Sequence, residues 1–365
     1  MKRVLIVLPF LKNGDGTAVA IMNYYEALIE DGWNVDFLSL REIQCEWDSM
    51  VKNNGGKVYA LPAKNKYSIE VKRALKKVLR ENKYDIVHVN MPGHIGAMAL
   101  KFAKKNGCKG RIFHCHNPKN TINFKTKFST VFYDYFCKKY ANYYAACSET
   151  AGISRFGDRE FTVLKNVIDI ERFSYNEEKR FQIRNELGIN NRCVIGVAGR
   201  FAKQKNPDFI IDCFKEVHKR NSNAFLLWIG EGELLDYVAD RLQKENLQGN
   251  YCLPGRKNNI EDWYSAMDLF FLPSVFEGMG IVFLEAQSVG VPCIGSKNVP
   301  RETEVTELMN RIDLATEMDV WVDRILEILS GQYERKDRKI EFIDAGYTHE
   351  QTSKDMLRLY QDIIE

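Results

Sequence analysis

The sequence of 365 residues lacks several features that mark particular classes of protein. No stretch reaches the roughly 18 uninterrupted apolar residues of a membrane-spanning helix. The nine cysteines are scattered and never spaced as C-x-x-C, so we expect reduced thiols and neither a disulfide framework nor a zinc site. With 45% hydrophobic residues the chain can still bury a large apolar core. We therefore expect a globular, cytoplasmic protein without a bound metal ion.

The chain also lacks internal repeats and instead alternates short apolar runs with segments of helical period. The apolar runs, rich in β-branched residues, cover residues 3–10, 34–40, 85–90, 111–116, 143–148, 193–200, 224–230, 250–255, 269–274 and 291–296. Strand–helix alternation predicts parallel sheets with helices on both faces, and so many strands predict two sheets. A polar connection over residues 162–181 separates them. The sequence thus predicts an α/β protein of two Rossmann-like domains facing a cleft, with ligands bound beyond the carboxyl ends of the strands.

Two cations follow the strand expected at residues 193–200. Arg200 ends this strand, and Lys205 lies in the loop before a helix that is expected to begin near residues 206–207. Because both cations lie at the carboxyl end of a strand, they can meet an anionic ligand there.

The segment FEGMGIVFLEAQ follows the apolar run 269–274 and carries two glutamates eight residues apart, Glu277 and Glu285. Gly278 and Gly280 permit a tight turn and close approach of a ligand to the backbone. A helix is expected to begin at about Gly280.

The first amides of that helix form an anion site. The N–H groups of Gly280, Ile281 and Val282 have no acceptor inside a helix and point outward. With Arg200 and Lys205 nearby, a diphosphate is the natural occupant, and several charged contacts must converge to hold it.

The two glutamates flank this anion site. Glu285, within the helix, can accept hydrogen bonds from a vicinal diol such as a ribose, and Glu277 can address the group beyond the phosphates. The order ribose, diphosphate, substituent is the outline of a nucleotide sugar.

The segments PSVFEGMGIVFLEAQSVGVPCIGS and GRFAKQKN resemble the retaining glycosyltransferases of family 4, of the bacterial polysaccharide-biosynthesis type, which have the GT-B fold. The resemblance extends from RVLIVLPF through LKNVIDIERF and IGEGEL to YTHEQTSKDMLRLYQDII. It implies an acceptor-side domain over residues 1–168, a nucleotide-sugar-binding domain over residues 169–350, and a last helix, residues 351–365, that completes the first domain.

The resemblance also implies residue roles. Arg200 and Lys205 match the cations on the donor diphosphate, and Glu285 matches the ribose ligand. Four consecutive residues match the positions that contact the transferred sugar: Glu277, Gly278, Met279 and Gly280.

Further matches lie elsewhere in the chain. His116 matches a histidine near the reacting sugar, and Arg256 sits where the family contacts the base. Gly16 matches the second glycine of a loop that approaches the phosphates. Asp15 and Ala18 depart from the pattern of this loop, where the family has a glycine and a glutamate, which weakens its phosphate role.

The implied reaction retains anomeric configuration and needs no metal or cofactor. No D-x-D motif, the usual metal–diphosphate clamp of the other main glycosyltransferase fold, occurs in the chain. Glu277 and His116 are the candidate catalytic residues, Glu277 for steadying an oxocarbenium-like state and His116 for orienting the sugar. We expect transfer of a hexose or N-acetylhexosamine from a nucleotide sugar, by family precedent a UDP-sugar, to a glycan acceptor that is free or linked to a lipid.

Positive charge is concentrated in the first half of the chain. Residues 1–165 hold 27 Lys and Arg against 15 Asp and Glu, a net charge of +12, so the remaining residues carry −9. Residues 101–144 contain ten basic residues and a single acid, Asp134. Such a face attracts an anionic membrane surface, a phosphorylated acceptor or nucleic acid, or is an ordinary solvated surface.

Aromatic residues recur in the same region at every fourth position: Phe124, Phe128, Phe132, Phe136, Tyr140 and Tyr144. At that spacing the stripe drifts around a helix, so part of it belongs to the core and part is exposed. Exposed rings next to lysines suit the interface of an anionic membrane. The hypothesis is docking on the inner face of the cell membrane to receive a lipid-linked glycan, with no nucleic-acid partner.

Three alternatives stay open on the sequence alone. A nicotinamide-dependent dehydrogenase would use the loop NGDGTAV, but Val19 stands where its third glycine is required. A non-catalytic partner subunit of glycosyltransferase shape would show an eroded donor site, and the departures at Asp15 and Ala18 leave room for it. A glycosyltransferase with a protein acceptor is the third.

Overall fold

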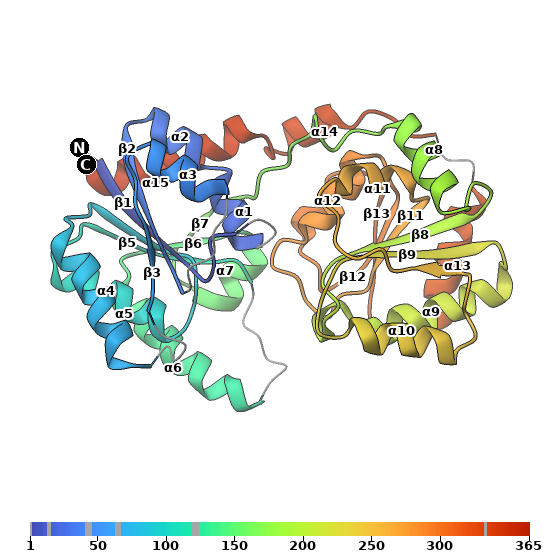
Figure 1. Ribbon diagram of the computed structural model, residues 1–365, viewed down its shortest axis with the longest axis horizontal. Coiled ribbons are helices and arrows are strands. Elements are labelled where there is room, and N and C mark those ends of the chain that lie inside the picture. The colour runs from blue at the N-terminus through green and yellow to red at the C-terminus, as the bar shows by residue number, and fades with distance from the viewer. Residues whose placement is uncertain (1, 13–15, 41–45, 63–66, 118–123, 332–333) are drawn as a thin grey trace. The chain divides into compact units, whose positions relative to one another are not determined.

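The computed structural model describes residues 2–12, 16–40, 46–62, 67–117, 124–331 and 334–365. The chain divides into two compact units (Figure 1). The first unit contains Met1–Val167 and His349–Glu365, and the second contains Ile168–Thr348.

The first unit is built on a parallel sheet with the strand order β3-β2-β1-β4-β5-β6-β7. Its strands are β1 (Lys2–Leu8), β2 (Trp33–Ser39), β3 (Val58–Ala60), β4 (Ile86–Val89), β5 (Gly110–Cys115), β6 (Tyr143–Ala146) and β7 (Thr162–Val163). Its helices are α1 (Gly16–Met22), α2 (Tyr25–Glu30), α3 (Glu46–Asn53), α4 (Ile69–Glu81), α5 (His94–Lys105), α6 (Phe124–Tyr140), α7 (Glu149–Phe156) and α15 (His349–Ile364). The central strands are buried on both faces, which explains their continuous apolar runs.

The second unit repeats this plan with the strand order β10-β9-β8-β11-β12-β13, again parallel. Its strands are β8 (Cys193–Ala198), β9 (Ala224–Ile229), β10 (Tyr251–Cys252), β11 (Leu269–Leu272), β12 (Cys293–Ser296) and β13 (Met309–Ile312). Its helices are α8 (Glu177–Glu186), α9 (Pro207–Arg220), α10 (Leu235–Lys244), α11 (Ile260–Ala266), α12 (Ile281–Ser288), α13 (Met318–Ser330) and α14 (Lys339–Asp344), with 3₁₀ turns η1 (Lys203–Lys205) and η2 (Arg301–Thr303). The prediction of two parallel α/β sheets is confirmed.

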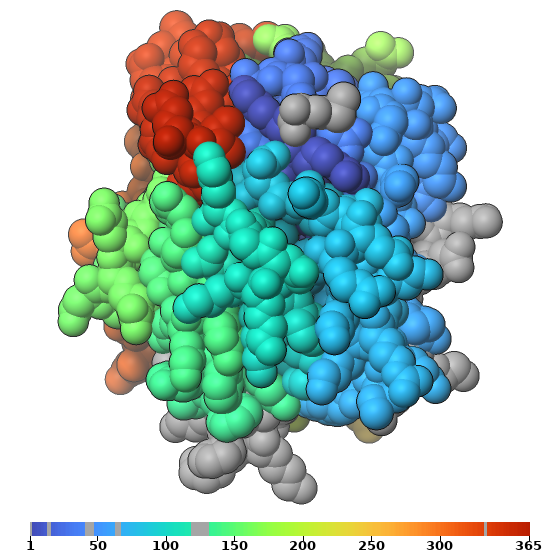
Figure 2. All heavy atoms as spheres, turned by 90° about the vertical axis from the view of Figure 1, so that its left-hand side faces the viewer, coloured from blue at the N-terminus to red at the C-terminus, as the bar shows by residue number. Residues whose placement is uncertain are grey.

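The last helix, α15, belongs to the core of the first unit although it follows the second unit in sequence. Tyr360 and Ile363 are buried with Trp33 in one apolar cluster, and the Tyr360 ring meets the Trp33 ring edge-on at 5.0 Å. Figure 2, which faces the first unit, shows this helix in red beside the blue start of the chain. No helix in the described ranges combines the length and the apolar character that crossing a membrane requires.

Candidate active site

Two loops of the second unit meet at the carboxyl ends of the neighbouring strands β8 and β11. The turn η1 follows β8, and residues 273–280 follow β11. Lys205, the last residue of η1, places Nζ 2.6 Å from Oε1 of Glu277, and both side chains are largely buried, 13% and 8% exposed. The structure therefore brings together the predicted phosphate cation and the predicted sugar carboxylate as an ion pair.

The Glu277 carboxylate is held by two further side chains. Ser274, fully buried, donates its hydroxyl to the same Oε1 at 2.6 Å. Gln204 Nε2 lies 3.4 Å from Oε2 and donates to the carbonyl oxygen of Phe276 at 3.0 Å. Because a charged acceptor strengthens hydrogen bonds and both loops contribute donors, the carboxylate has a defined orientation.

A glycine lets Lys205 lie close to the end of β8. Gly199 adopts φ +151°, and a Cβ built there would lie 3.1 Å from Cε of Lys205. A larger residue at position 199 would therefore move the lysine.

Arg200 does not share this cluster of contacts. Its guanidinium Nη2 pairs with Oε2 of Glu233 at 3.0 Å, and the two side chains are 71% and 55% exposed. An exposed ion pair contributes little to stability and separates easily. A phosphate role for Arg200 stays a prediction that requires this pair to open.

The start of α12 has the geometry of an anion site. Gly280 caps the helix with φ +73°, where a side chain would be strained and would press on Thr303 and Val299 at 3.2 Å. Among the described residues, the amides of Gly280, Ile281 and Val282 donate no hydrogen bond to another group. The predicted helix start at about Gly280 lies one residue before the observed start at Ile281. The prediction and the structure therefore assign the same amides to the start of the helix.

Glu285 lies one turn into α12 and is partly buried. Its Oε2 accepts a hydrogen bond of 2.8 Å from the hydroxyl of Tyr264 on α11. Burial raises the pKa of Glu285 from 4.5 to about 7, while the Tyr264 hydroxyl and the charge of Arg172 oppose this rise. The carboxylate is thus poised to ionise near neutral pH.

His116 follows β5 in the first unit. Its Nε2 lies 2.9 Å from Oδ1 of Asn90, the residue after β4, and its ring packs on His114 with centroids 4.1 Å apart. Burial lowers the pKa of His116 to about 4, so the imidazole is neutral at physiological pH.

The remaining predicted residues have less defined surroundings. Arg256 is exposed after Gly255, whose carbonyl oxygen accepts from the amide of Gly230. Gly16 begins α1, and a Cβ there would meet open space. Ala18 is buried in the apolar cluster of the first unit, a place unsuited to the glutamate of the family pattern. Asp15 lies outside the described residues.

Within the described part of the chain, no group of three or more His, Cys, Asp and Glu side chains is arranged to hold a metal ion. The cysteines described there are free thiols. His114 and His116 lie on one face of β5 and Cys115 on the other, as strand geometry requires.

Two family models match consecutive parts of the chain. The model described as Glycosyltransferase Family 4 matches residues 14–172, and the model described as Glycosyl transferases group 1 matches residues 179–343. The matched ranges include the strand end that carries His116 and both loops that hold Lys205 and Glu277. The chain belongs to the family 4 glycosyltransferases.

Two bacterial relatives of this glycosyltransferase are similar over most of the chain. EpsF of Bacillus subtilis (strain 168), assigned to the glycosyltransferases, is 28% identical over 98% of this chain and 96% of its own. The Escherichia coli UDP-Gal:alpha-D-GlcNAc-diphosphoundecaprenol alpha-1,3-galactosyltransferase is 31% identical over 61% of this chain and 60% of its own.

The solved structure of Anabaena HepE in complex with UDP and glucose matches the glycosyltransferase with a TM-score of 0.80. The match covers 99% of this chain and 100% of HepE at 14% identity. A likeness at this identity shows the fold, which is GT-B.

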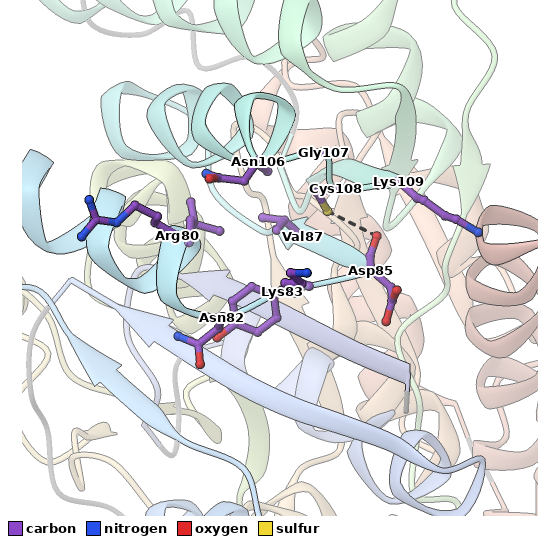
Figure 3. Close-up of a pocket in the computed structure, with 12 residues that line it drawn as sticks. Arg80, Asn82, Lys83, Asp85, Val87, Asn106, Gly107, Cys108 and Lys109 are labelled. Atoms are coloured by element: carbon purple, nitrogen blue, oxygen red, sulfur yellow. Dashed lines mark hydrogen bonds between the residues drawn. The ribbon is translucent and has the colours of Figure 1, made fainter.

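The glycosyltransferase also contains a cavity of about 440 Å³ in its first unit, at the edge of the sheet opposite to His116 (Figure 3). Asp85 and Lys109, which line it, precede β4 and β5, so the cavity lies at the amino ends of these strands. Cys108 closes one side, and its Sγ donates to the carbonyl oxygen of Asp85 at 3.3 Å. The cavity lining contains none of the predicted site residues.

Sequence reasoning missed four residues that hold the site: Ser274, Gln204, Asn90 and Tyr264. Three of them lie at or near the carboxyl ends of strands, where ligands are expected to bind, and could have been predicted on that ground. Ser274 closely follows β11, Gln204 precedes Lys205 in the same turn, and Asn90 directly follows β4. Tyr264 lies within α11, where nothing in the local sequence marks it.

Proposed function

We propose that this glycosyltransferase moves a hexose or N-acetylhexosamine from a UDP-sugar to a glycan acceptor, with retention of configuration and without a metal ion. The proposed pathway is the synthesis of a bacterial surface polysaccharide. The observation that carries the proposal is the ion pair of Lys205 and Glu277 at the carboxyl ends of β8 and β11, in the loop that leads into α12, whose first amides donate no hydrogen bond within the described residues. The UDP found in the HepE structure and the UDP-Gal in the name of the E. coli relative support the choice of donor.

In the proposed reaction the leaving diphosphate is stabilised by charge that the chain itself supplies. The amides of Ile281 and Val282 and the dipole of α12 bind phosphate oxygens, as helix N-termini do. Lys205 lies within 2.6 Å of Glu277 and is shared between this carboxylate and the diphosphate. Fixed donors aimed at developing negative charge stabilise the transition state without reorganising at the moment of reaction.

Glu277 faces the sugar in this proposal. Its Oε1 is engaged by Lys205 and Ser274, whereas Oε2 lies 3.4 Å from Gln204 and retains capacity to accept hydrogen bonds from sugar hydroxyls. An oriented carboxylate also stabilises an oxocarbenium-like transition state by charge. Glu285 binds the ribose diol.

Calorimetric titration with UDP, GDP and NAD tests the nucleotide assignment. The proposal expects UDP to bind, and to bind unchanged when EDTA is present. Slow hydrolysis of one UDP-sugar, followed by proton NMR of the released sugar, then identifies the donor. Binding of NAD alone contradicts the proposal and favours the dehydrogenase alternative. Binding of no nucleotide also contradicts it and favours a non-catalytic partner subunit.

We further propose that the acceptor is linked to a lipid and that α6 contacts the inner face of an anionic membrane. Val131, Phe132 and Tyr135 on this helix are 51%, 49% and 59% exposed. Lys139 Nζ lies 5.9 Å from the Tyr135 ring. Aromatic rings beside lysines suit the headgroup region of a bilayer that carries negative charge. The name of the E. coli relative, which contains a diphosphoundecaprenol, supports a lipid-linked acceptor.

Sedimentation with vesicles at moderate salt tests the membrane contact. We expect binding to vesicles that contain anionic lipid, little binding to neutral vesicles, and loss of binding in the variant Phe132→Ser, Tyr135→Ser. The control is Phe181→Ser, a phenylalanine on α8 of the second unit that is more exposed, at 66%. Equal binding to neutral and anionic vesicles contradicts the electrostatic part of the proposal.

A further inference from the structure

Asn90 and His116 lie at the carboxyl ends of adjacent strands. Asn90 directly follows β4 and His116 directly follows β5, and these strands pair in parallel. Oδ1 of Asn90 lies 2.9 Å from Nε2 of His116, and the Asn90 side chain is 3% exposed. The contact is therefore a hydrogen bond with a buried acceptor and a partly buried imidazole.

The orientation of the Asn90 amide is set by a second hydrogen bond. Its Nδ2 donates to the carbonyl oxygen of His88 at 3.3 Å, which turns Oδ1 toward His116. An amide oxygen accepts and never donates, so Nε2 of His116 must carry the hydrogen. In a neutral imidazole the other nitrogen, Nδ1, then holds a free lone pair.

The imidazole is neutral because its surroundings disfavour the cation. Burial lowers the pKa of His116 to about 4, and the neighbouring rings of His88 and His114 also have lowered pKa values because of burial. The three histidine rings form a row that ends at Tyr360 of α15. The Tyr360 hydroxyl lies 2.8 Å from Nδ1 of His88, and burial raises the pKa of this hydroxyl. No member of the row is charged at neutral pH.

The ring of His116 is also fixed in orientation. It packs on the His114 ring at a centroid distance of 4.1 Å and a tilt of 34°. His114 is in turn tied to His88 by a contact of 3.1 Å between Nδ1 and Nε2. Nδ1 of His116 thus keeps a constant direction.

We propose that Asn90 is a positioning residue that holds His116 as the Nε2–H tautomer, so that Nδ1 accepts a hydrogen bond from a hydroxyl of the transferred or accepting sugar. The tautomer itself follows from the contacts above, whereas the use of Nδ1 by a sugar rests on the proposed function. The opposite tautomer would present an N–H group at the same point, which cannot accept from a hydroxyl.

The first test reads the tautomer directly. Long-range ¹⁵N–¹H NMR on the full chain, labelled at histidine and assigned with the variant His116→Gln, distinguishes a protonated Nε2 from a protonated Nδ1. We expect Nε2–H in the wild type and a mixture of tautomers in Asn90→Leu. A protonated Nδ1 in the wild type overturns the proposal whether or not the chain binds UDP.

The second test follows sugar transfer, or hydrolysis of the UDP-sugar donor, as a function of pH. Asn90→Leu is expected to lower kcat about tenfold at every pH, which corresponds to the loss of one hydrogen bond. Asn90→Asp restores an acceptor for Nε2–H, but its negative charge raises the pKa of His116. Its activity should therefore be low in acid, where Nδ1 is protonated, and approach the wild-type value in alkali.

Controls separate this role from folding and from donor binding. UDP affinity should be unchanged in both Asn90 variants, and Asn106→Leu, an amide at the C-terminal end of α5, should leave kcat unchanged. If Asn90→Leu and Asn90→Asp lose kcat equally and show identical pH profiles, Asn90 has only a structural role and the proposal is refuted. Absence of UDP binding in the wild type would refute the proposed function and leave the tautomer measurement valid.

Discussion

Replacing Glu285 by glutamine should make the protein more stable and its nucleotide binding weaker, in a manner that depends on pH. Burial raises the pKa of this carboxyl group from 4.5 to about 7. The folded protein therefore holds the Glu285 proton more tightly than the unfolded chain does between these values. It follows that stability falls as the pH rises from about 4.5 to about 7, and the full destabilisation is present above pH 7.

The size of the effect follows from the pKa values. One pKa unit corresponds to about 1.4 kcal/mol, so a rise from 4.5 to about 7 destabilises the folded protein by roughly 3 kcal/mol at pH 8. Glutamine preserves the shape and still accepts the hydrogen bond from Tyr264, which is 2.8 Å in the native chain. We expect Glu285→Gln to be more stable by up to about 3 kcal/mol at pH 8 and nearly unchanged at pH 4.5.

Urea unfolding of wild type and variant at pH 4.5 and pH 8 measures this difference. The control is Glu186→Gln on α8, which removes one negative charge from an exposed position of the same unit. In parallel, UDP should bind the variant about tenfold more weakly at pH 8, since a neutral amide is a poorer acceptor for two ribose hydroxyls. The same stability difference at both pH values would refute the reasoning about burial, and unchanged UDP affinity would refute the ribose assignment.

Three further changes test the same account. Lys205→Met should weaken UDP binding at least about tenfold by calorimetry, whereas Lys203→Met, an exposed lysine of the same turn, should not; equal affinities would remove Lys205 from the diphosphate site. Gly199→Val should also weaken UDP binding, because its side chain would displace Lys205, and an affinity equal to wild type would show that the lysine is free to relocate. Asp134→Leu should lower the free energy of unfolding, measured in urea, by about 3–5 kcal/mol, since it removes the carboxylate that lies 2.6 Å from the buried guanidinium of Arg155. A loss under about 1 kcal/mol would mean that water reaches Arg155.

The fold was predictable because strand periodicity and burial coincide in this chain. The predicted runs 193–200 and 224–230 contain β8 and β9, whose residues are without charge and mostly apolar, as expected of strands buried on both faces. Three strands, β3, β7 and β13, lay outside every predicted run, and β7 has only two residues. β3 has three residues, and the sequence of β13, Met309–Ile312, contains Asn310 and Arg311. Short or polar edge strands carry too little periodic signal to be recognised.

The candidate site was predictable only for groups whose chemistry is visible in the sequence. Charged residues in loops after strands, such as Lys205 and Glu277, can be expected to meet ligands, but their direct ion pair of 2.6 Å depends on the adjacency of β8 and β11 in the sheet. The aromatic stripe near residue 132 illustrates the same limit. Phe132 and Tyr135 are both exposed, although Tyr135 does not belong to the stripe of aromatic residues at every fourth position. Which rings are exposed depends on the surface against which α6 packs.

A structure of the chain crystallised with UDP tests the donor site most directly. We predict diphosphate oxygens within hydrogen-bonding distance of the amides of Ile281 and Val282 and of Lys205 Nζ, and ribose hydroxyls on the Glu285 carboxylate. UDP bound at any other place, or bound with its phosphates turned away from the start of α12, would contradict the account.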